Sequence, residues 1–158
     1  MRKRRSLTRT APALVATALV GGLGTDVKSR WYAQLDKPDW QPPGWVFGPA
    51  WTTLYALIAT GSARALDRIE DDDERYRYAL ALGANLALNV GWTWVFFRGK
   101  RPKWALAEVV LLELSTIDLV RRTAKVDGTA AALLVPYAAW NGFATALTAS
   151  IARRNPGA

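Results

Sequence analysis

Residues 31–55 read WYAQLDKPDWQPPGWVFGPAWTTLY, and this stretch decides how the rest of the chain is interpreted. It contains four of the eight tryptophans and four of the eight prolines. The prolines at positions 38, 42 and 43 fix φ and remove backbone donors, so residues 37–44 cannot form an ordinary helix interior. No residue from position 44 to 63 is charged. The stretch therefore predicts a stiff aromatic loop that runs directly into an apolar helix.

Charged residues gather in short clusters, and apolar stretches of roughly 17 to 25 residues separate these clusters. A helix needs about 20 apolar residues to cross a bilayer, whereas a soluble helix carries a polar stripe along its whole length. We therefore expect an all-α fold, an integral membrane bundle of five transmembrane helices in one domain. The expected spans are residues 10–27, 43–66, 76–97, 102–120 and 128–152, with a basic tail at 1–9, a Pro-rich loop at 28–43 and a C-terminal tail at 153–158.

The N-terminus combines a basic segment with the apolar sequence APALVATALVGGLG. A signal peptide has the same order of features, but an uncleaved first span completes the set of five helices. Five Lys and Arg residues precede position 10, and such residues favour the cytoplasmic side of a membrane. We therefore predict a multi-pass membrane protein with a cytoplasmic N-terminus.

Composition excludes several classes of function. The formal net charge of +8 could suit nucleic acid, but the cations lie in turns between apolar spans, so membrane lipid is the expected partner and nucleic acid is not. The chain has no cysteine and no histidine, which excludes disulfides, the usual zinc sites and histidine acid–base catalysis. We expect no metal site and no required cofactor, and a bound haem would have no axial His or Cys ligand.

Polar side chains inside the apolar spans indicate which faces point into the bundle. Asn85, Asn89, Trp92 and Phe96 follow one another in steps of four, three and four residues, so they share one face of the span 76–97. Two amides in a charge-free span are costly unless they have partners. Asn89 is therefore either a contact between helices or a contact to a ligand.

Aromatic rings occupy a face of two other spans. Trp51 and Tyr55 lie one turn apart in the span 43–66, and Tyr137, Trp140 and Ala144 share a face of the span 128–152. Packed under the Pro-rich loop, these faces would enclose a flat-walled, mostly apolar pocket suited to rigid, planar, hydrophobic molecules. The alternative is that the rings simply fill the core of the bundle.

The span 102–120 is the least apolar, because Glu108, Glu113 and Asp118 interrupt it. Their spacing of five residues places them about 140° apart, so they cannot line one face. Asp118 lies near Arg121 and Arg122 and is expected to form an ion pair at the helix end. Glu113 has either a structural role or a role in handling a proton or a substrate.

Three sequence blocks resemble a known family. They are W-Y-x-x-L-x-K-P-x-W-x-P-P-x-W with P-x-W-T-x-L-Y at 31–55, L-A-L-N-x-x-W-x-x-x-F-F at 86–97, and L-x-P-Y-x-x-W-x-x-F-A-T at 134–145. In this order they closely resemble the TspO/MBR family of tryptophan-rich sensory proteins and translocator proteins, in its bacterial type. The resemblance implies a five-helix membrane protein, usually a homodimer, that binds porphyrins and other hydrophobic ligands in a pocket roofed by the first loop.

The resemblance also implies positions for the ligand contacts. The matching pocket positions are Trp51, Asn89, Trp92, Trp140 and Ala144. Tyr32, Pro42, Pro43 and Tyr55 match the rim or wall, and the shared helix faces add Phe96 and Tyr137. Lys37 or Arg30, near the loop, could pair with the propionates of a tetrapyrrole.

One departure from the family pattern narrows the range of candidate ligands. Animal members end their last helix with L-N-Y-x-x-x-R, a motif associated with cholesterol, whereas residues 147–153 read LTASIAR and lack both the Asn and the Tyr. This argues against specialised cholesterol binding.

Three functions fit the sequence. The first is a membrane receptor or sensor that binds tetrapyrroles and regulates tetrapyrrole or stress metabolism. The second is a carrier of hydrophobic anions such as porphyrins. The third, the only enzymatic alternative, is light- or oxygen-dependent porphyrin degradation, in which Trp51 and Trp140 would be the catalytic redox partners.

Overall fold

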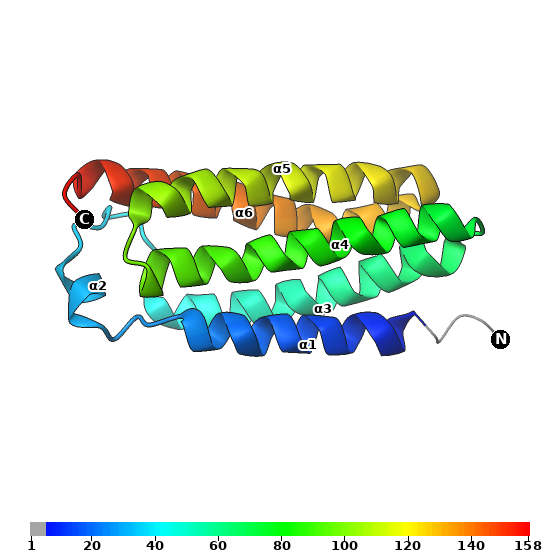
Figure 1. The fold of residues 1–158 in the computed structure, drawn as a ribbon, viewed down its shortest axis with the longest axis horizontal. Coiled ribbons are helices and arrows are strands. Elements are labelled where there is room, and N and C mark those ends of the chain that lie inside the picture. The colour runs from blue at the N-terminus through cyan, green and yellow to red at the C-terminus, as the bar shows by residue number, and fades with distance from the viewer. Residues whose placement is uncertain (1–5) are drawn as a thin grey trace.

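The computed structural model describes residues 6–158, and these form an all-helical chain (Figure 1). The elements are α1 (Leu7–Gly24), α2 (Arg30–Gln34), α3 (Gly44–Arg68), α4 (Asp72–Thr93), the π-helix η1 (Trp94–Arg98), α5 (Pro102–Val126) and α6 (Gly128–Arg154). The predicted all-α bundle of long helices is confirmed, with a correction to the count. A sixth α-helix, the short α2, lies in the segment 28–43 that is predicted as a loop. Residues 1–5 of the predicted basic tail lie outside the described residues.

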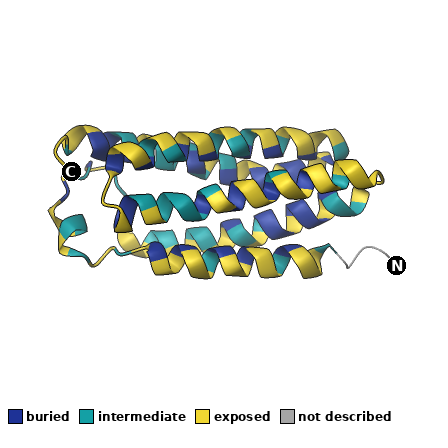
Figure 2. Ribbon diagram, in the orientation of Figure 1, coloured by how far each residue is buried: buried dark blue, intermediate teal, exposed yellow. Residues whose placement is uncertain are grey.

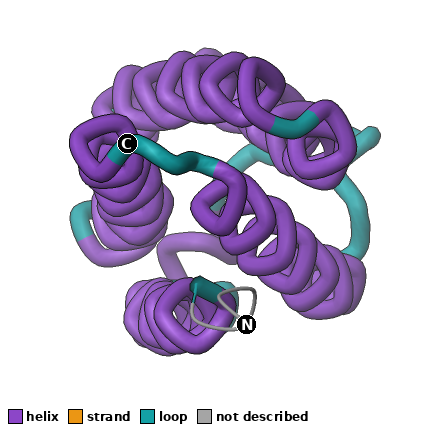
Figure 3. The backbone as a smooth tube through the Cα atoms, turned by 90° about the vertical axis from the view of Figure 1, so that its right-hand side faces the viewer, coloured by secondary structure: helices purple, strands orange, loops and turns teal. Residues whose placement is uncertain are grey.

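The long helices run alternately up and down the bundle (Figure 1). Their contacts close into a ring in the order α1, α3, α6, α5, α4 and back to α1. The view along the bundle shows the long helices placed side by side around a common interior (Figure 3). The helix α2 and the C-terminus lie at one end, while the start of α1 and the α3–α4 turn lie at the other (Figure 1). Different segments of the chain therefore form the two ends of the bundle.

Side-chain caps set several helix ends. The Asp71 carboxylate accepts the Glu74 backbone N–H at 2.7 Å, so α4 begins at Asp72, before the predicted span 76–97. The Asp127 carboxylate accepts the Thr129 and Ala130 backbone N–H groups at 2.9 and 3.1 Å and starts α6. Several helices thus extend beyond the apolar spans, because hydropathy reports the environment of a helix and caps report its ends.

Asp127 also joins α3 to the start of α6. The Nε atoms of Arg64 and Arg68 lie 2.5 and 2.9 Å from its Oδ2, and the Asp127 side chain is only 4% exposed. Burial by itself raises the pKa of this carboxyl. The hydrogen bond from Ala130 and the two guanidinium groups outweigh burial, and the net effect is a lowered pKa.

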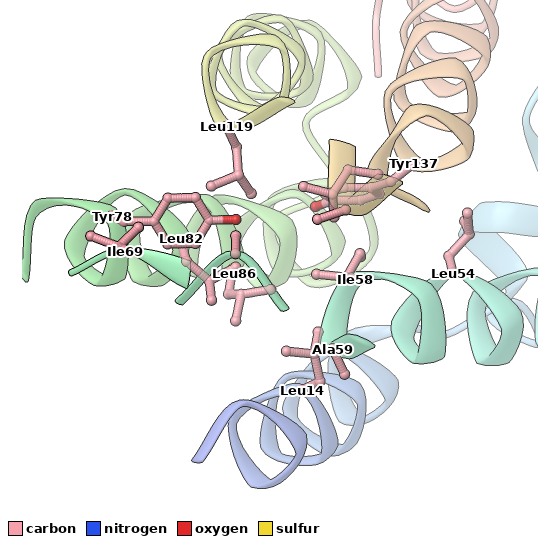
Figure 4. Close-up of a cluster of buried hydrophobic side chains, with 13 residues drawn as sticks. Leu14, Leu54, Ile58, Ala59, Ile69, Tyr78, Leu82, Leu86, Leu119 and Tyr137 are labelled. Carbon is pink, nitrogen blue, oxygen red and sulfur yellow. The ribbon is translucent and has the colours of Figure 1, made fainter. Parts of the chain in front are cut away.

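The main apolar cluster fills the middle of the bundle and extends to the α3–α4 end (Figure 4). Its largest fully buried side chains are those of Ile58, Leu119, Leu134 and Tyr137. Tyr78 points into the same cluster from α4, and its OH is 2.8 Å from the Thr123 hydroxyl. Buried residues lie on the inward faces of the helices and exposed ones on the outward faces (Figure 2). This cluster fills the interior of the bundle from its middle to the α3–α4 end.

A second apolar cluster lies at the α2 end. Its buried members are Leu35, Phe96, Phe97, Ala105, Leu147 and Ile151. Leu35 belongs to the Pro-rich segment, whereas the others come from η1, α5 and α6. The Pro-rich segment is therefore packed onto the bundle by an apolar side chain.

The outward faces carry large apolar side chains, among them Leu19 and Leu23 on α1 and Leu111 and Leu114 on α5, each more than half exposed. Among the described residues, two helices are long and apolar enough by length and composition to cross a membrane, Asp72–Arg98 and Gly128–Arg154. An apolar outer surface of this extent is typical of a protein that contacts lipid or another apolar partner.

Candidate ligand-binding site

A cavity of about 330 Å³ lies at the α2 end, enclosed by the Pro-rich segment and the helices α3, α4, η1 and α6. Its lining consists of Thr25, Val27, Tyr32, Gln41, Gly44, Phe47, Trp51, Trp92, Thr93, Phe96, Phe97, Trp140, Phe143, Ala144, Leu147, Thr148 and Ile151. The lining is mostly aromatic and aliphatic, with a few hydroxyl and amide groups. Small-molecule pockets have this composition, and the volume is at the low end of their range.

Ring contacts hold the walls in place. Trp51 stacks on Tyr55 with centroids 5.4 Å apart and meets Trp140 edge to face at 6.0 Å. On the opposite wall Trp92 stacks on Phe96 at 5.5 Å. Such contacts add about 0.5–1.5 kcal/mol per pair beyond burial. Contacts within the chain therefore fix the positions of the wall rings, without any contribution from a ligand.

The π-helix η1 explains why two consecutive phenylalanines are buried. The Gly99 N–H donates to the Trp94 carbonyl at 2.8 Å, which is the i→i+5 pattern of a π-turn. The wider turn brings Phe96 and Phe97 inward together, with centroids 4.9 Å apart. A regular α-helix would rotate adjacent residues by about 100° and favour burial of one of them. The predicted face of the span 76–97 is therefore extended by Phe97.

A hydrogen-bonded layer lies behind the Trp51 wall. The Tyr55 hydroxyl donates to Asn89 Oδ1 at 2.9 Å, and Asn89 Nδ2 donates to the Tyr137 hydroxyl at 3.2 Å. Tyr137 donates to Asn85 Oδ1 at 3.0 Å, and Asn85 Nδ2 donates to Thr116 Oγ1 at 2.9 Å. We call this chain of side chains the inner polar layer. It joins α3, α4, α5 and α6 and includes the buried residues Asn85, Asn89 and Thr116.

The predicted contact residues fall into three groups. Those that line the cavity are Tyr32, Trp51, Trp92, Phe96, Trp140 and Ala144. Tyr55, Asn89 and Tyr137 belong to the inner polar layer instead. Pro42 and Pro43 lie between Gln41 and Gly44, which line the cavity, but do not line it themselves. That the lining residues bind a ligand stays a prediction.

The roof of the cavity, residues 28–43, is held together by its own polar groups. The Tyr32 hydroxyl accepts Gln41 Nε2–H at 3.0 Å, and Lys37 Nζ donates to the carbonyls of Tyr32 and Leu35 at 2.6 and 3.2 Å. Burial raises the pKa of the Tyr32 phenol, and the Gln41 hydrogen bond offsets part of this rise. Lys37 therefore stabilises the roof, and neither it nor Arg30 lines the cavity.

The C-terminal end of α6 fastens the roof to the bundle. Asn155 Oδ1 accepts the Asp36 backbone N–H at 2.9 Å, and Asn155 Nδ2 donates to the Asp36 carbonyl at 2.9 Å. Arg154 adds an ion pair to the Asp36 carboxylate at 3.4 Å. The side-chain amide thus pairs with Asp36 as a neighbouring β-strand would. We call the Asn155–Asp36 pair the roof latch.

Two polar atoms of lining residues have no hydrogen-bond partner within the described chain. They are Trp92 Nε1, a donor, and Gln41 Oε1, an acceptor, and both are buried. A buried polar group without a partner costs about 1–3 kcal/mol. A ligand with an acceptor and a donor could satisfy both groups after small side-chain movements.

The acids of α5 lie outside this cavity. Both carboxylate oxygens of Glu108 are buried without a hydrogen-bond partner in the described chain. They lie against α4 at Gly91, where a Cβ atom would come within 3.0 Å of Oε1. Glu113 faces α6 near Gly142 and also has one unpartnered buried oxygen. The predicted ion pair of Asp118 with Arg122 is present at 2.6 Å.

Several lining residues are absent from the predicted set. Phe143, Leu147 and Ile151 continue the face of Trp140 and Ala144 in steps of three and four residues, so extending the periodicity would have found them. Gln41 and Thr25 carry no comparable signal, because loop residues follow no helical period. Asn155 also lacked a local signal, since its partner Asp36 is far away in the sequence.

Comparisons with known proteins agree with this architecture. The profile of the TspO/MBR family matches residues 10–154. The chain is 37% identical over 151 residues to the human (Homo sapiens) translocator protein, covering 93% of this chain and 87% of that protein. It is 37% identical over 154 residues to protein CrtK of Rhodobacter capsulatus, covering 96% of each chain. It is 40% identical over 127 residues to the tryptophan-rich sensory protein of Cereibacter sphaeroides, covering 80% of this chain and 77% of that protein.

No group of three or more Asp or Glu side chains is placed to hold a metal ion within residues 6–158, and His and Cys do not occur in the sequence. The family match covers α3, α4, α5 and α6, α1 from residue 10 onward, and all three sequence blocks described above. The chain belongs to the TspO/MBR family of membrane proteins.

Proposed function

We propose that this protein is a multi-pass membrane receptor or sensor that binds a tetrapyrrole, such as protoporphyrin, in the aromatic cavity at the α2 end. The observation that carries the proposal is the convergence of Trp51, Trp92 and Trp140 on one shared cavity. Flat rings in offset or edge contact suit a planar conjugated ligand, and the relatives' names include a tryptophan-rich sensory protein and translocator proteins.

The proposed topology follows from helix length and surface. The helices α3, α5 and α6 have 25, 25 and 27 residues, and at about 1.5 Å per residue each is longer than a bilayer core of about 30 Å. In α3 and α6 the charged residues lie near the ends, whereas Glu108 and Glu113 interrupt α5, whose outward face exposes apolar side chains such as Leu111. The N-terminus would be cytoplasmic, and a homodimer would bury part of the apolar surface.

The roof covers the aromatic cavity, since its residues Tyr32 and Gln41 are among the lining residues. Binding would therefore need movement of the roof, which Leu35 and the roof latch hold down. Lys37 and Arg30 could reach the propionates only after such a movement, because Lys37 is bonded within the roof. The proposal thus includes a closed and an open position of the roof.

The test is a titration of purified protein with protoporphyrin, followed by tryptophan quenching. Trp51→Ala and Trp140→Ala should each weaken protoporphyrin binding by about 5- to 150-fold. This corresponds to about 1–3 kcal/mol of binding free energy for one aromatic ring that no longer contacts the ligand. Trp104→Ala is the matched control, because Trp104 is 67% exposed on α5 and does not line the cavity. If all three variants bound protoporphyrin as tightly as the parent protein does, the ligand would have to bind elsewhere.

The same material separates the alternatives. Uptake of protoporphyrin by proteoliposomes, beyond binding, would support the carrier. A porphyrin product that forms under light and requires Trp140 would support degradation. The two tryptophans that would act as redox partners, Trp51 and Trp140, are in edge-to-face contact, with ring centroids 6.0 Å apart. Bleaching at the rate of detergent blanks would argue against degradation.

A further inference from the structure

A second hollow lies at the end of the bundle opposite the aromatic cavity. Its volume is about 440 Å³, and it lies between the α3–α4 turn, the first turns of α4 and the last turns of α5. These segments meet at the end of the bundle where α1 begins (Figure 1). Its lining residues are Ile69, Asp71, Asp73, Glu74, Arg77, Tyr78, Arg122, Lys125 and Val126. Ile69 and Tyr78 are buried and form its base. Both signs of charge therefore border one space over an apolar base.

Most of these charges are not paired with one another. In the part of the chain that the structure describes, Arg77, Lys125 and Asp73 have no hydrogen-bond or ion-pair partner. Arg122 pairs with Asp118, which lies outside the hollow, and that pair is about half exposed on both sides. No ion pair joins the acids of α4 to the cations of α5 across the space. A ligand that carries both charges could bridge the two sets.

A groove with an apolar wall on α4 lies next to this hollow, along the seam between α4 and α5. Arg77 and Arg122 border both spaces, so the two lie next to each other. Beyond them the groove is lined by Leu80, Ala81 and Ala84 on α4 and by Ser115 and Asp118 on α5. Its α4 side belongs to a helix that is apolar enough to cross a membrane. The alanines leave a trough, because their side chains are short. A charged hollow followed by an apolar trough is the shape of a site for an amphiphile with one charged end.

We propose that this hollow and trough together bind one phosphatidylethanolamine molecule. Its phosphate would lie among Arg77, Arg122 and Lys125, its ammonium group would face Asp73 and Glu74, and one acyl chain would follow the trough over the alanines. The inference rests on the membrane placement proposed above, and it does not depend on any ligand of the aromatic cavity.

The charges around the hollow favour the phosphatidylethanolamine headgroup over those of phosphatidylglycerol and phosphatidylcholine. A phosphatidylglycerol headgroup has no cation and would leave the carboxylates of Asp71, Asp73 and Glu74 unmatched near its phosphate. A phosphatidylcholine headgroup has a cation but no N–H donor for those carboxylates. Only a primary ammonium makes charge-assisted hydrogen bonds on the acidic side while the phosphate makes them on the basic side.

The test compares lipids on the purified full-length protein in detergent. Dioleoyl phosphatidylethanolamine, phosphatidylglycerol, phosphatidylcholine and diacylglycerol are added separately, and the retained lipid is counted by native mass spectrometry alongside the thermal unfolding midpoint. We expect one retained phosphatidylethanolamine and the largest midpoint shift with that lipid. Arg77→Gln or Lys125→Gln should lower its affinity by about tenfold, as loss of one charge-assisted hydrogen bond predicts. Asp73→Asn should remove the preference over phosphatidylglycerol.

Arg121→Gln is the matched control, because Arg121 is an exposed cation on the same turn of α5 but borders neither space. Ala84→Phe, which fills the trough, should lower binding of all the diacyl lipids. Equal binding of phosphatidylethanolamine and phosphatidylglycerol, or equal loss in Arg121→Gln and Arg77→Gln, would overturn the proposal. So would a change of oligomeric state in Ala84→Phe with lipid binding intact, since the groove would then be an interface between copies. Protoporphyrin affinity should stay unchanged in Arg77→Gln, which separates this site from the aromatic cavity.

Discussion

Substitution of Asn155 by Ala is the most direct test of how the roof controls the cavity. The side chain makes the two hydrogen bonds to the Asp36 backbone, both at 2.9 Å, that define the roof latch. Pro38, Pro42 and Pro43 have no backbone N–H to replace them. Besides the latch, Leu35 holds this part of the roof through the apolar cluster at the α2 end. The variant should therefore loosen the roof without releasing it.

The structure sets the size of the effect. Each hydrogen bond contributes about 0.5–1.5 kcal/mol, and the partly exposed position favours the lower half of this range. Loss of both should shift the balance between the closed and the open roof by about 1–2 kcal/mol, which is a factor of about 5–30. If the ligand enters and leaves only through the open roof, its association and dissociation rates should both rise by roughly this factor. The equilibrium affinity should change much less, because the cavity lining is untouched.

Stopped-flow tryptophan quenching with protoporphyrin measures both rates. Asp36→Asn is the matched control: it removes the exposed ion pair with Arg154 but leaves both backbone bonds to Asn155, and exposed pairs of this kind contribute about 0–1 kcal/mol. Because the chain has no cysteine, cysteines placed at 36 and 155 can be joined by a short reducible maleimide linker without background reaction. The linked protein should neither load nor release ligand until the linker is reduced. Unchanged rates in Asn155→Ala, together with normal loading of the linked protein, would refute a gating role for the roof.

Three further outcomes follow from named contacts. Ala144→Phe should weaken protoporphyrin binding by about 5- to 150-fold, since the new ring occupies the cavity and repacking strain costs on the order of 1–3 kcal/mol; a titration checks this, and unchanged binding would show that the ligand does not use the α6 wall. Tyr137→Phe should lower stability by about 1–3 kcal/mol, because Asn89 Nδ2 and Asn85 Oδ1 lose their shared partner; thermal unfolding in detergent measures it, with the exposed Tyr76→Phe as control. Asp127→Asn should flatten the acid end of the stability profile: folding lowers the pKa of Asp127 below its ordinary 3.8, so its stabilisation is present above that value and is lost as the pH falls through the folded pKa. A variant with the same acid sensitivity as the parent would assign that sensitivity to other carboxyls.

Helical periodicity predicts much of the cavity, because a face of a long helix is a local property of the sequence. Trp51, Trp92 and Trp140 each lie on an aromatic face of a different predicted span, and the structure brings these faces to one cavity. Asn89 illustrates where periodicity stops. Its position on the inward face is correct, but only the packed bundle shows that Tyr55 and Tyr137 take up its polar groups. Helical periodicity shows which way a side chain points, whereas its hydrogen-bond partner depends on how the helices pack against one another.

Features that depend on long-range register or on a local change of helix type could not be predicted. The π-turn at Trp94–Arg98 inserts an extra residue in the turn, and no residue in that stretch signals it. The pairing of Asn155 with Asp36 joins segments 119 positions apart in the sequence. The extensions of α4 and α5 beyond the apolar spans follow from caps and from helix propensity, which a count of apolar residues ignores.

The closed half of the bundle bears on the choice between a receptor and a carrier. Directly beneath the cavity lie the inner polar layer and the most deeply buried apolar residues, among them Ile58, Leu134 and Tyr137. Passage of a ligand toward the α3–α4 end would require separation of these residues together with the hydrogen bonds of Asn89 and Asn85, each of which costs about 0.5–1.5 kcal/mol to lose. Entry from the α2 end requires only the roof to move, against two hydrogen bonds and the packing of Leu35. The architecture therefore favours binding and release on one side of the membrane, which is how a receptor works.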